Sequence, residues 1–243
     1  SLAPNEPVFD HVNVSGLAGQ TVTVKAELFG PYPALDAMTC EGAPIWSGSF
    51  TADHDGTYQT DTVSLLTPGY YTYRESIVES PTVKGVVTPC GDIAETTVVR
   101  ATPKVTTQVS AAETAPGAEL QDNVIVTGLG ALRATINVNL YGPFATKGEI
   151  SCGGTPVWSG TVTANGDGTY QTDKFALPSA GYYTYVESLP AGAASSGSEG
   201  VCGEASETTI AKAAPKVVTR VSDQVVGPGT SISDNLTVSG LGG

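Results

Sequence analysis

The stretch Gly166–Ser188 reads GDGTYQTDKFALPSAGYYTYVES, and most of it recurs at Asp55–Ser76 as DGTYQTDTVSLLTPGYYTYRES. Glu75 and Glu187 occupy matching places in the two copies and lie 112 positions apart (187 − 75). Other pairs keep the same spacing: Trp46 and Trp158, Glu95 and Glu207, Cys40 and Cys152, Cys90 and Cys202. The chain is therefore a tandem repeat, and its fold should be one unit used more than once.

Alignment of the copies predicts three parts. Residues 101–212 form a complete second repeat that opens with PKVTTQVS at Pro103–Ser110. Residues 1–100 form a first repeat without a counterpart of that opening strand. Residues 213–243 begin a third copy, because PKVVTRVS and then DNLTVSGL follow there in the same order.

Two interpretations of this layout are open. In one, the chain samples a longer array, and neighbouring residues complete the first repeat. In the other, Pro215–Val226 of one subunit completes the first repeat of an identical subunit, and head-to-tail addition builds a fibre. We prefer the array, because residues 227–243 duplicate residues 3–19 and a donated segment would bring a surplus strand.

Composition and periodicity indicate an all-β fold. Gly (29) and Pro (16) divide the chain into short segments rich in Thr, Val and Tyr, which favour strands. In RATINVNLYG, Ile136, Val138 and Leu140 alternate with polar residues, as expected for a strand with one buried face. Asn165–Gly168 (NGDG) has the residues of a tight turn. We expect tandem Ig-like β-sandwich repeats of about seven strands each.

The charge balance excludes some partners. The net charge is −13, from 24 acidic and 11 basic residues, and the basic residues do not cluster. Nucleic acid and anionic lipid are therefore not expected as partners, since phosphate binding needs concentrated positive charge. Insertion into a membrane is not expected either, because no segment approaches the roughly 20 apolar residues of a spanning helix.

Each repeat contains two cysteines, and their internal spacing is 50 in both (90 − 40 and 202 − 152). The histidines, His11 and His54, both lie in the first repeat, so a repeated zinc site is not expected. We predict two disulfides, Cys40–Cys90 and Cys152–Cys202. Disulfides persist in oxidising compartments, which indicates a secreted or cell-surface protein.

The motif DxVxVxGL, followed by an alternating strand and later by GYYTY, resembles the stalk repeats of actinobacterial cell-surface proteins. It is also similar in layout to Gram-positive adhesin repeats with an Ig-like or Cna-B-like sandwich. The resemblance implies a spacer that holds an adhesive tip away from the cell wall. It also implies a covalent Lys–Asn or Thr–Gln crosslink within each repeat. Neither pair is kept in both repeats: Lys25 aligns with Asn137, and Glu95 and Glu207 stand in the last strand where the Thr–Gln crosslink needs a glutamine. We therefore expect no such crosslink, and a disulfide in its mechanical role.

Glu75 and Glu187 share strand parity with the tyrosines before them. If that face is buried, each carboxylate needs a partner. In the second repeat, Lys104 is a candidate partner and Asp122 a candidate helper, so a crosslink or buried-acid site is one interpretation. The other, which we prefer, is a hydrogen-bonded or solvent-facing glutamate.

For two further sets of residues, the acidic turns and the tryptophans, a structural role is weighed against ligand binding. The acidic turns contain Asp53 and Asp55, and Asn165 and Asp167, which are too few oxygens for Ca²⁺, so hairpin turns are expected. Trp46 and Trp158 follow the first cysteine of their repeats by six residues (46 − 40). Core packing against the disulfide is the preferred interpretation, and an exposed carbohydrate-binding aromatic is the alternative.

No nucleophile–base set recurs and no phosphate-binding glycine loop precedes a helix, so neither an enzyme nor a cofactor or metal site is expected. The predicted function is a structural, extracellular repeat that forms a stalk or fibre, with neighbouring repeats of the same or an identical chain as partners. The alternative is a binding module that recognises a glycan or host protein through its end loops.

Overall fold

The computed structural model describes residues 1–241, and these are almost entirely strands, turns and loops. The helical segments within this range are four 3-10 turns of three residues each: η1 (Leu35–Ala37), η2 (Ile93–Glu95), η3 (Lys147–Glu149) and η4 (Ala205–Glu207). None of the described residues forms a helix long and apolar enough to cross a membrane. The predicted all-β class is confirmed.

The second repeat builds two main sheets. One has the strand order β10-β13-β16, and the other has the order β11-β20-β18-β14-β15, with β19 beside β18. A short pair, β12-β17, lies apart from both. The bounds are β10 (Lys104–Val109), β11 (Glu113–Thr114), β12 (Glu119–Leu120), β13 (Asp122–Thr127), β14 (Arg133–Phe144), β15 (Trp158–Asn165), β16 (Gly168–Gln171), β17 (Phe175–Ala176), β18 (Gly181–Leu189), β19 (Ser198–Glu199) and β20 (Thr208–Ala211).

The first repeat follows the same pairing scheme. Its larger sheet has the order β4-β3-β7-β8 with β9 beside β7, and β2-β5 and β1-β6 are separate pairs. The bounds are β1 (Pro7–Val8), β2 (His11–Val14), β3 (Val22–Tyr32), β4 (Trp46–Ala52), β5 (Gly56–Gln59), β6 (Val63–Ser64), β7 (Gly69–Ile77), β8 (Val86–Val87) and β9 (Thr96–Val99). Within the described residues, β10 is the main strand of the second repeat without a counterpart here.

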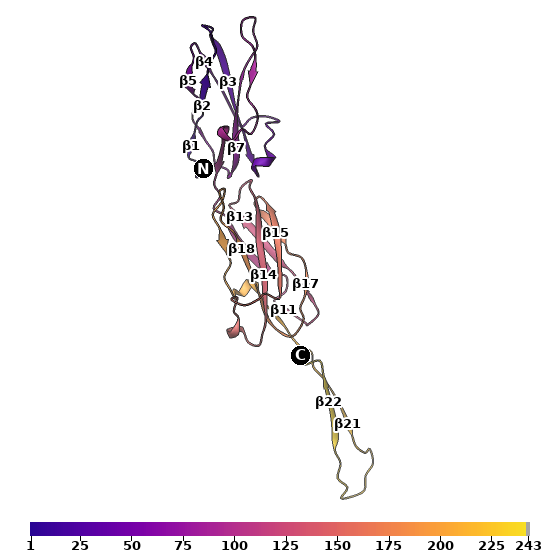
Figure 1. The fold of residues 1–243 in the computed structure, drawn as a ribbon. Helices are drawn as coiled ribbons and strands as arrows, with labels where there is room; N and C mark the ends of the chain where they lie inside the picture. The colour runs from indigo at the N-terminus through magenta and orange to yellow at the C-terminus, as the bar shows by residue number, and fades with distance from the viewer. Residues whose placement is uncertain (242–243) are drawn as a thin grey trace.

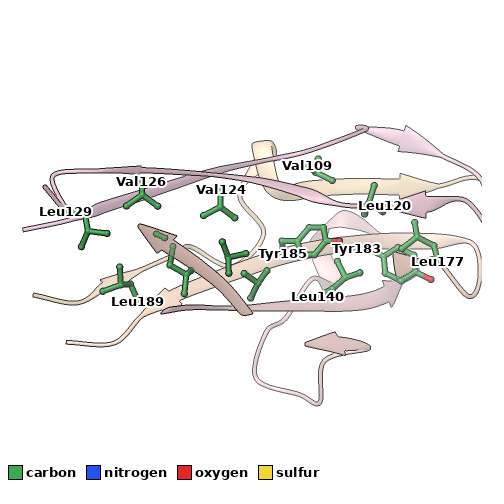
Figure 2. Packing of buried hydrophobic residues seen from close by; sticks show 14 of the residues in the cluster. Val109, Leu120, Val124, Val126, Leu129, Leu140, Leu177, Tyr183, Tyr185 and Leu189 are labelled. Atoms are coloured by element: carbon green, nitrogen blue, oxygen red, sulfur yellow. The ribbon is translucent and has the colours of Figure 1, made fainter. Parts of the chain in front are cut away.

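The core of the second repeat lies between its two main sheets. Figure 2 shows Val124 and Val126 of β13 pointing toward the layer that contains Tyr185, Leu140 and Leu189. The predicted alternation along β14 is confirmed, because Ile136, Val138 and Leu140 are fully buried. Burial of such side chains supplies most of the favourable free energy of folding.

Two predicted strands of the second repeat differ from the observed ones. The segment 168–177 forms two strands because it changes partner: β16 pairs with β13, and β17 pairs with β12. The bend comes at Thr172, whose N–H donates to the Asp122 carbonyl (3.0 Å) and whose hydroxyl accepts from the Asp122 N–H (2.9 Å). The segment 203–211 begins with η4, since the Thr208 hydroxyl donates to the Glu204 carbonyl (2.7 Å) and closes a turn.

The first two repeats are arranged end to end (Figure 1). Loops of the first repeat meet the β13–β14 turn of the second: the Ala131 N–H donates to the Pro68 carbonyl (2.9 Å), and the Arg133 N–H donates to the Pro33 carbonyl (3.2 Å). Gly130 lies in this turn at φ +67°, and a Cβ there would be 2.7 Å from the Pro68 carbonyl oxygen. The junction is thus a close backbone contact, not only a covalent link.

The predicted third copy begins with a hairpin of β21 (Lys216–Val221) and β22 (Asp234–Ser239), drawn in yellow in Figure 1. Lys216 pairs with Ser239 just as Lys104 pairs with Thr127, so the β21–β22 register repeats that of β10–β13. Within the segment Pro215–Val226, the residues Lys216–Val221 thus pair with Asp234–Ser239 of the same chain. The last two residues of the predicted copy, 242 and 243, lie outside the described part of the chain.

One disulfide joins Cys40 to Cys90 and the other joins Cys152 to Cys202, which are the pairs that the equal spacing predicts. In each repeat the bridge ties the loop after the longest strand to the loop before the last 3-10 turn. A crosslink that closes a long loop reduces the conformational entropy of the unfolded chain.

The double variant Cys152→Ser/Cys202→Ser should therefore lower the free energy of unfolding of the second repeat by about 4 kcal/mol. Guanidinium denaturation of the full chain in a Trp46→Phe background, where Trp158 is the remaining tryptophan, measures the change by fluorescence. The matched variant Cys40→Ser/Cys90→Ser should leave that transition nearly unchanged. Equal losses from both variants would show that the repeats unfold as one unit.

Candidate functional site

The second repeat buries three carboxyl groups in one cluster, contributed by three elements. Asp122 begins β13, Glu187 lies on β18 and Glu207 ends η4. Their exposed fractions are 0%, 3% and 2%. One carboxylate oxygen from each lies within 4.8 Å of the others, so the three groups share a single small volume. We call them the second-repeat triad.

The alternation of β18 places Glu187 in the interior. Tyr183, Tyr185 and Leu189 are buried on the same face, and side chains two positions apart in a strand point the same way. The register confirms this position, because Glu187 lies opposite the buried Val138 of β14. A strand that buries its tyrosines in this register must also bury the glutamate.

Hydroxyl groups supply part of the hydrogen bonding. The Thr107 hydroxyl of β10 donates to Glu187 Oε2 (2.9 Å) and also lies within reach of Glu207. The remaining oxygens have no hydrogen-bond donor: both carboxylate oxygens of Asp122, Glu187 Oε1, Glu207 Oε2 and the hydroxyl of Tyr185. Buried oxygens without partners cost free energy, which makes this the most demanding polar region of the second repeat.

Burial and mutual repulsion keep protons on the triad. Desolvation, followed by the charges of Glu207 and Glu187, raises the pKa of Asp122 to about 9. Desolvation also raises the pKa of Glu207 to about 7 and, in the same direction, that of Glu187. The Asp122 and Glu187 carboxyls lie within hydrogen-bonding distance, so a single proton can be shared between them.

The first repeat holds an equivalent triad of Asp10, Glu75 and Glu95, with one carboxylate oxygen from each within 4.8 Å of the others. Glu75 is buried, but Asp10 and Glu95 are only partly buried. The hydroxyl that reaches Glu75 Oε2 comes from Thr88 (3.1 Å), since β10 has no counterpart among the residues described here. Desolvation raises the pKa of Glu95 to about 7, and those of Asp10 and Glu75 also rise.

The structure corrects one member of the predicted site. Lys104 is exposed and lies on the face of β10 opposite to Thr107, so it does not approach Glu187. Asp122 and Glu187 do meet. Of the two preferred states of the glutamate, the structure shows the hydrogen-bonded one, since Glu187 is buried and accepts from Thr107 instead of facing solvent. Glu207 and Thr107 belong to the site but were not predicted. The recurrence of Glu207 at the repeat spacing was the signal that could have identified it.

The acidic turns have a structural role. The Asp167 carboxylate accepts hydrogen bonds from the N–H groups of Gly128, Leu129 and Gly130, at 2.7–3.2 Å. Asp55 does the same for Gly16 and Leu17, both at 2.9 Å. These aspartates therefore hold the turn after β13 or β2, and their oxygens are already used.

The tryptophans pack on the core edge instead of presenting a free ring. Trp158 contacts Tyr185 edge to face, with ring centroids 6.2 Å apart, and Trp46 contacts Tyr73 in the same way at 6.1 Å. Each ring also covers a glycine two residues on: a Cβ on Gly160 would lie 2.5 Å from Trp158. The glycine in the strand thus makes room for the indole.

No protein-family model matches the sequence, and no curated protein shows significant similarity to it. The function must therefore be inferred from the chain itself. Chemically, the triads offer carboxylate oxygens and exchangeable protons in a buried setting.

The raised pKa values predict how stability depends on pH in metal-free buffer. A carboxyl whose pKa is higher in the folded state holds a proton that the unfolded chain releases, and this proton binding stabilises the folded state. The stabilisation is complete below the pKa of the carboxyl in the unfolded chain, about 4. It is lost as the pH rises toward the folded-state pKa values of about 7 to 9. Between pH 5 and pH 8, the free energy of unfolding of the second repeat should fall by at least about 2 kcal/mol.

Denaturation at a series of pH values measures this slope. Asp122→Asn should reduce it, whereas Glu199→Gln, which removes an exposed carboxyl of the same repeat, should not. A stability that is constant or increases over this range would contradict the predicted proton uptake.

Proposed function

We propose that this protein is a structural, non-catalytic extracellular repeat that works as a spacer in a stalk or fibre. Its modules are tandem Ig-like sandwiches, and its partners are neighbouring repeats of the same or an identical chain. By analogy, the sequence motifs resemble those of actinobacterial stalk repeats and Gram-positive adhesin modules. The physical support comes from the junction, the disulfides and the surface.

The junction between the first two repeats carries the proposal. Its hydrogen bonds join backbone to backbone, from Ala131 to Pro68 and from Arg133 to Pro33. In the segment between β9 and β10, Ala101 is buried. Its N–H donates to the Ala194 carbonyl (2.9 Å) and its carbonyl accepts from the Ser196 N–H (3.0 Å). A link restrained on both sides favours a fixed end-to-end geometry, which is what a spacer requires.

The disulfides support an extracellular setting. All four cysteines are paired within their own repeat. Such bonds persist where thiols are oxidised, as in secreted and cell-surface proteins. Under a pulling force, each bridge would also prevent extension of the roughly 50 residues that it encloses.

The alternative, a module that binds a glycan or host protein, has weaker support. A groove of about 660 Å³ lies on the first repeat between β3, β4 and the loop after β7. It is lined by small polar and aliphatic side chains such as Thr23, Ser47 and Ile77, and no aromatic residue is among its lining. Sugar recognition commonly uses an aromatic face, so this groove does not favour it.

Small-angle X-ray scattering of the full chain tests the spacer function. The native protein should scatter as an extended rod. Gly130→Ala should give a smaller maximum dimension and a broader distance distribution, because the new methyl group would meet the Pro68 carbonyl and Gly130 needs a positive φ.

The matched control is Gly148→Ala, since a Cβ at that position meets no atom within 4 Å. It should leave the scattering unchanged. A native chain that scatters as a flexible pair of beads would contradict the spacer proposal, and binding of the native chain to a glycan array would favour the alternative.

A further inference from the structure

The second-repeat triad and the adjoining Tyr185 contain five buried oxygens without a hydrogen-bond partner. They are the two carboxylate oxygens of Asp122, one each from Glu187 and Glu207, and the hydroxyl of Tyr185. Tyr185 is itself fully buried, and its hydroxyl experiences the charges of all three acids. The Tyr185 hydroxyl is evidence for a binding site that is independent of the acidic cluster, because it adds a neutral oxygen without a hydrogen-bond partner.

Neutralisation by a neighbouring side chain does not account for this arrangement. None of the ion pairs found among residues 1–241 includes Asp122, Glu187 or Glu207. Lys104 of β10, which the sequence suggested as the partner of Glu187, faces solvent. Three carboxylates would bring a charge of up to −3 into a buried volume, which requires a counter-ion or protons.

We propose that Asp122, Glu187, Glu207 and the Tyr185 hydroxyl form an internal binding site for one Ca²⁺ ion. All of the ligands are oxygens, and neither cysteine nor histidine belongs to the cluster, which favours a hard cation over zinc. This site goes beyond the proposed spacer function and does not depend on it.

The dimensions favour Ca²⁺. Ca²⁺ takes six to eight oxygens at 2.3–2.6 Å, so ligands on opposite sides of the ion lie at most about 5 Å apart. One carboxylate oxygen from each of the three acids lies within 4.8 Å of the other two. Five oxygens are unpartnered, and the second oxygens of Glu187 and Glu207 allow bidentate binding. Mg²⁺ retains several waters in an ideal octahedron, which a buried, protein-lined cluster does not provide.

The surrounding hydrogen bonds would orient the ligands. The Thr107 hydroxyl holds one oxygen of Glu187, which leaves the other directed at the cluster. Thr172 exchanges two hydrogen bonds with the backbone of Asp122 and so fixes the start of β13. Partners of this kind set the position of metal ligands in proteins.

The first repeat provides a natural comparison. Its triad also lies beside an unpartnered tyrosine hydroxyl, that of Tyr73, but Asp10 and Glu95 are partly exposed. Water can compete for these oxygens. We therefore assign the stronger site to the second repeat.

Terbium luminescence tests the site in the full chain, because Tb³⁺ replaces Ca²⁺ at oxygen sites. Trp158 lies against Tyr185, with centroids 6.2 Å apart, so excitation of these rings should sensitise a bound ion. The native chain, freed of metal with a chelator and kept at pH 8, should show saturable luminescence that Ca²⁺ displaces. Addition of Ca²⁺ should also raise the melting temperature.

Asp122→Asn and Glu207→Gln keep the side-chain size and should each weaken binding at least 10-fold, while circular dichroism verifies that the variants fold. Asp223→Asn, an exposed residue of the β21–β22 hairpin, controls for the loss of one charge. Asp10→Asn controls for the first-repeat triad and should leave the stronger site intact.

Three results would overturn the proposal. The first is the absence of both a Tb³⁺ signal and a Ca²⁺-dependent melting shift at millimolar ion, which would mean that the triad holds only protons. The second is a signal that Asp122→Asn and Glu207→Gln leave unchanged, which would mean a surface site. The third is loss of the signal with Asp10→Asn alone, which would place binding in the first repeat.

Discussion

The inward face of β18 constrains the rest of the second repeat. Pairing of β18 with β14 places Tyr185 opposite Leu140 and Glu187 opposite Val138. The two-residue period of the strand carries Tyr183, Tyr185 and Glu187 into the same buried layer. A shift of one residue would expose the tyrosines, so the apolar contacts enforce burial of the carboxyl group. Asp122 and Glu207 then meet it from β13 and η4.

Comparison of the repeats indicates which part of this arrangement is required. Both repeats keep a triad and a neighbouring tyrosine. In both, a threonine hydroxyl accepts a hydrogen bond from the backbone N–H of the triad aspartate, Thr60 in the first repeat and Thr172 in the second. The hydroxyl that reaches the strand glutamate differs in origin: Thr88 supplies it in the first repeat and Thr107 in the second. Different threonines donate to Oε2 of the strand glutamate in the two repeats, which indicates that this oxygen needs a hydrogen-bond donor in both.

The triad also has a mechanical consequence. Its three acids come from β13 in one sheet, from β18 in the other and from η4 in the connecting segment. Protons or a cation held among them would connect the two sheets through the core, while the disulfide connects loops at the edge. A spacer under load would gain from both links, because each opposes separation of the sheets.

Local patterns in the sequence were enough to determine the all-β class, most strands, the repeat spacing and the cysteine pairing, since each is a matter of periodicity or of equal distances along the chain. The composition of the candidate site was decided by the tertiary structure. Lys104 was predicted to face the site but lies outside, because its position in β10 has the parity opposite to that of Thr107. Glu207 follows Asp122 by 85 residues and meets it only because β18 pairs with β20 and the two sheets pack face to face. Period alone tells which residues of a strand share a face. Whether that face is buried, and which distant carboxyl groups meet there, depends on the pairing and stacking of sheets.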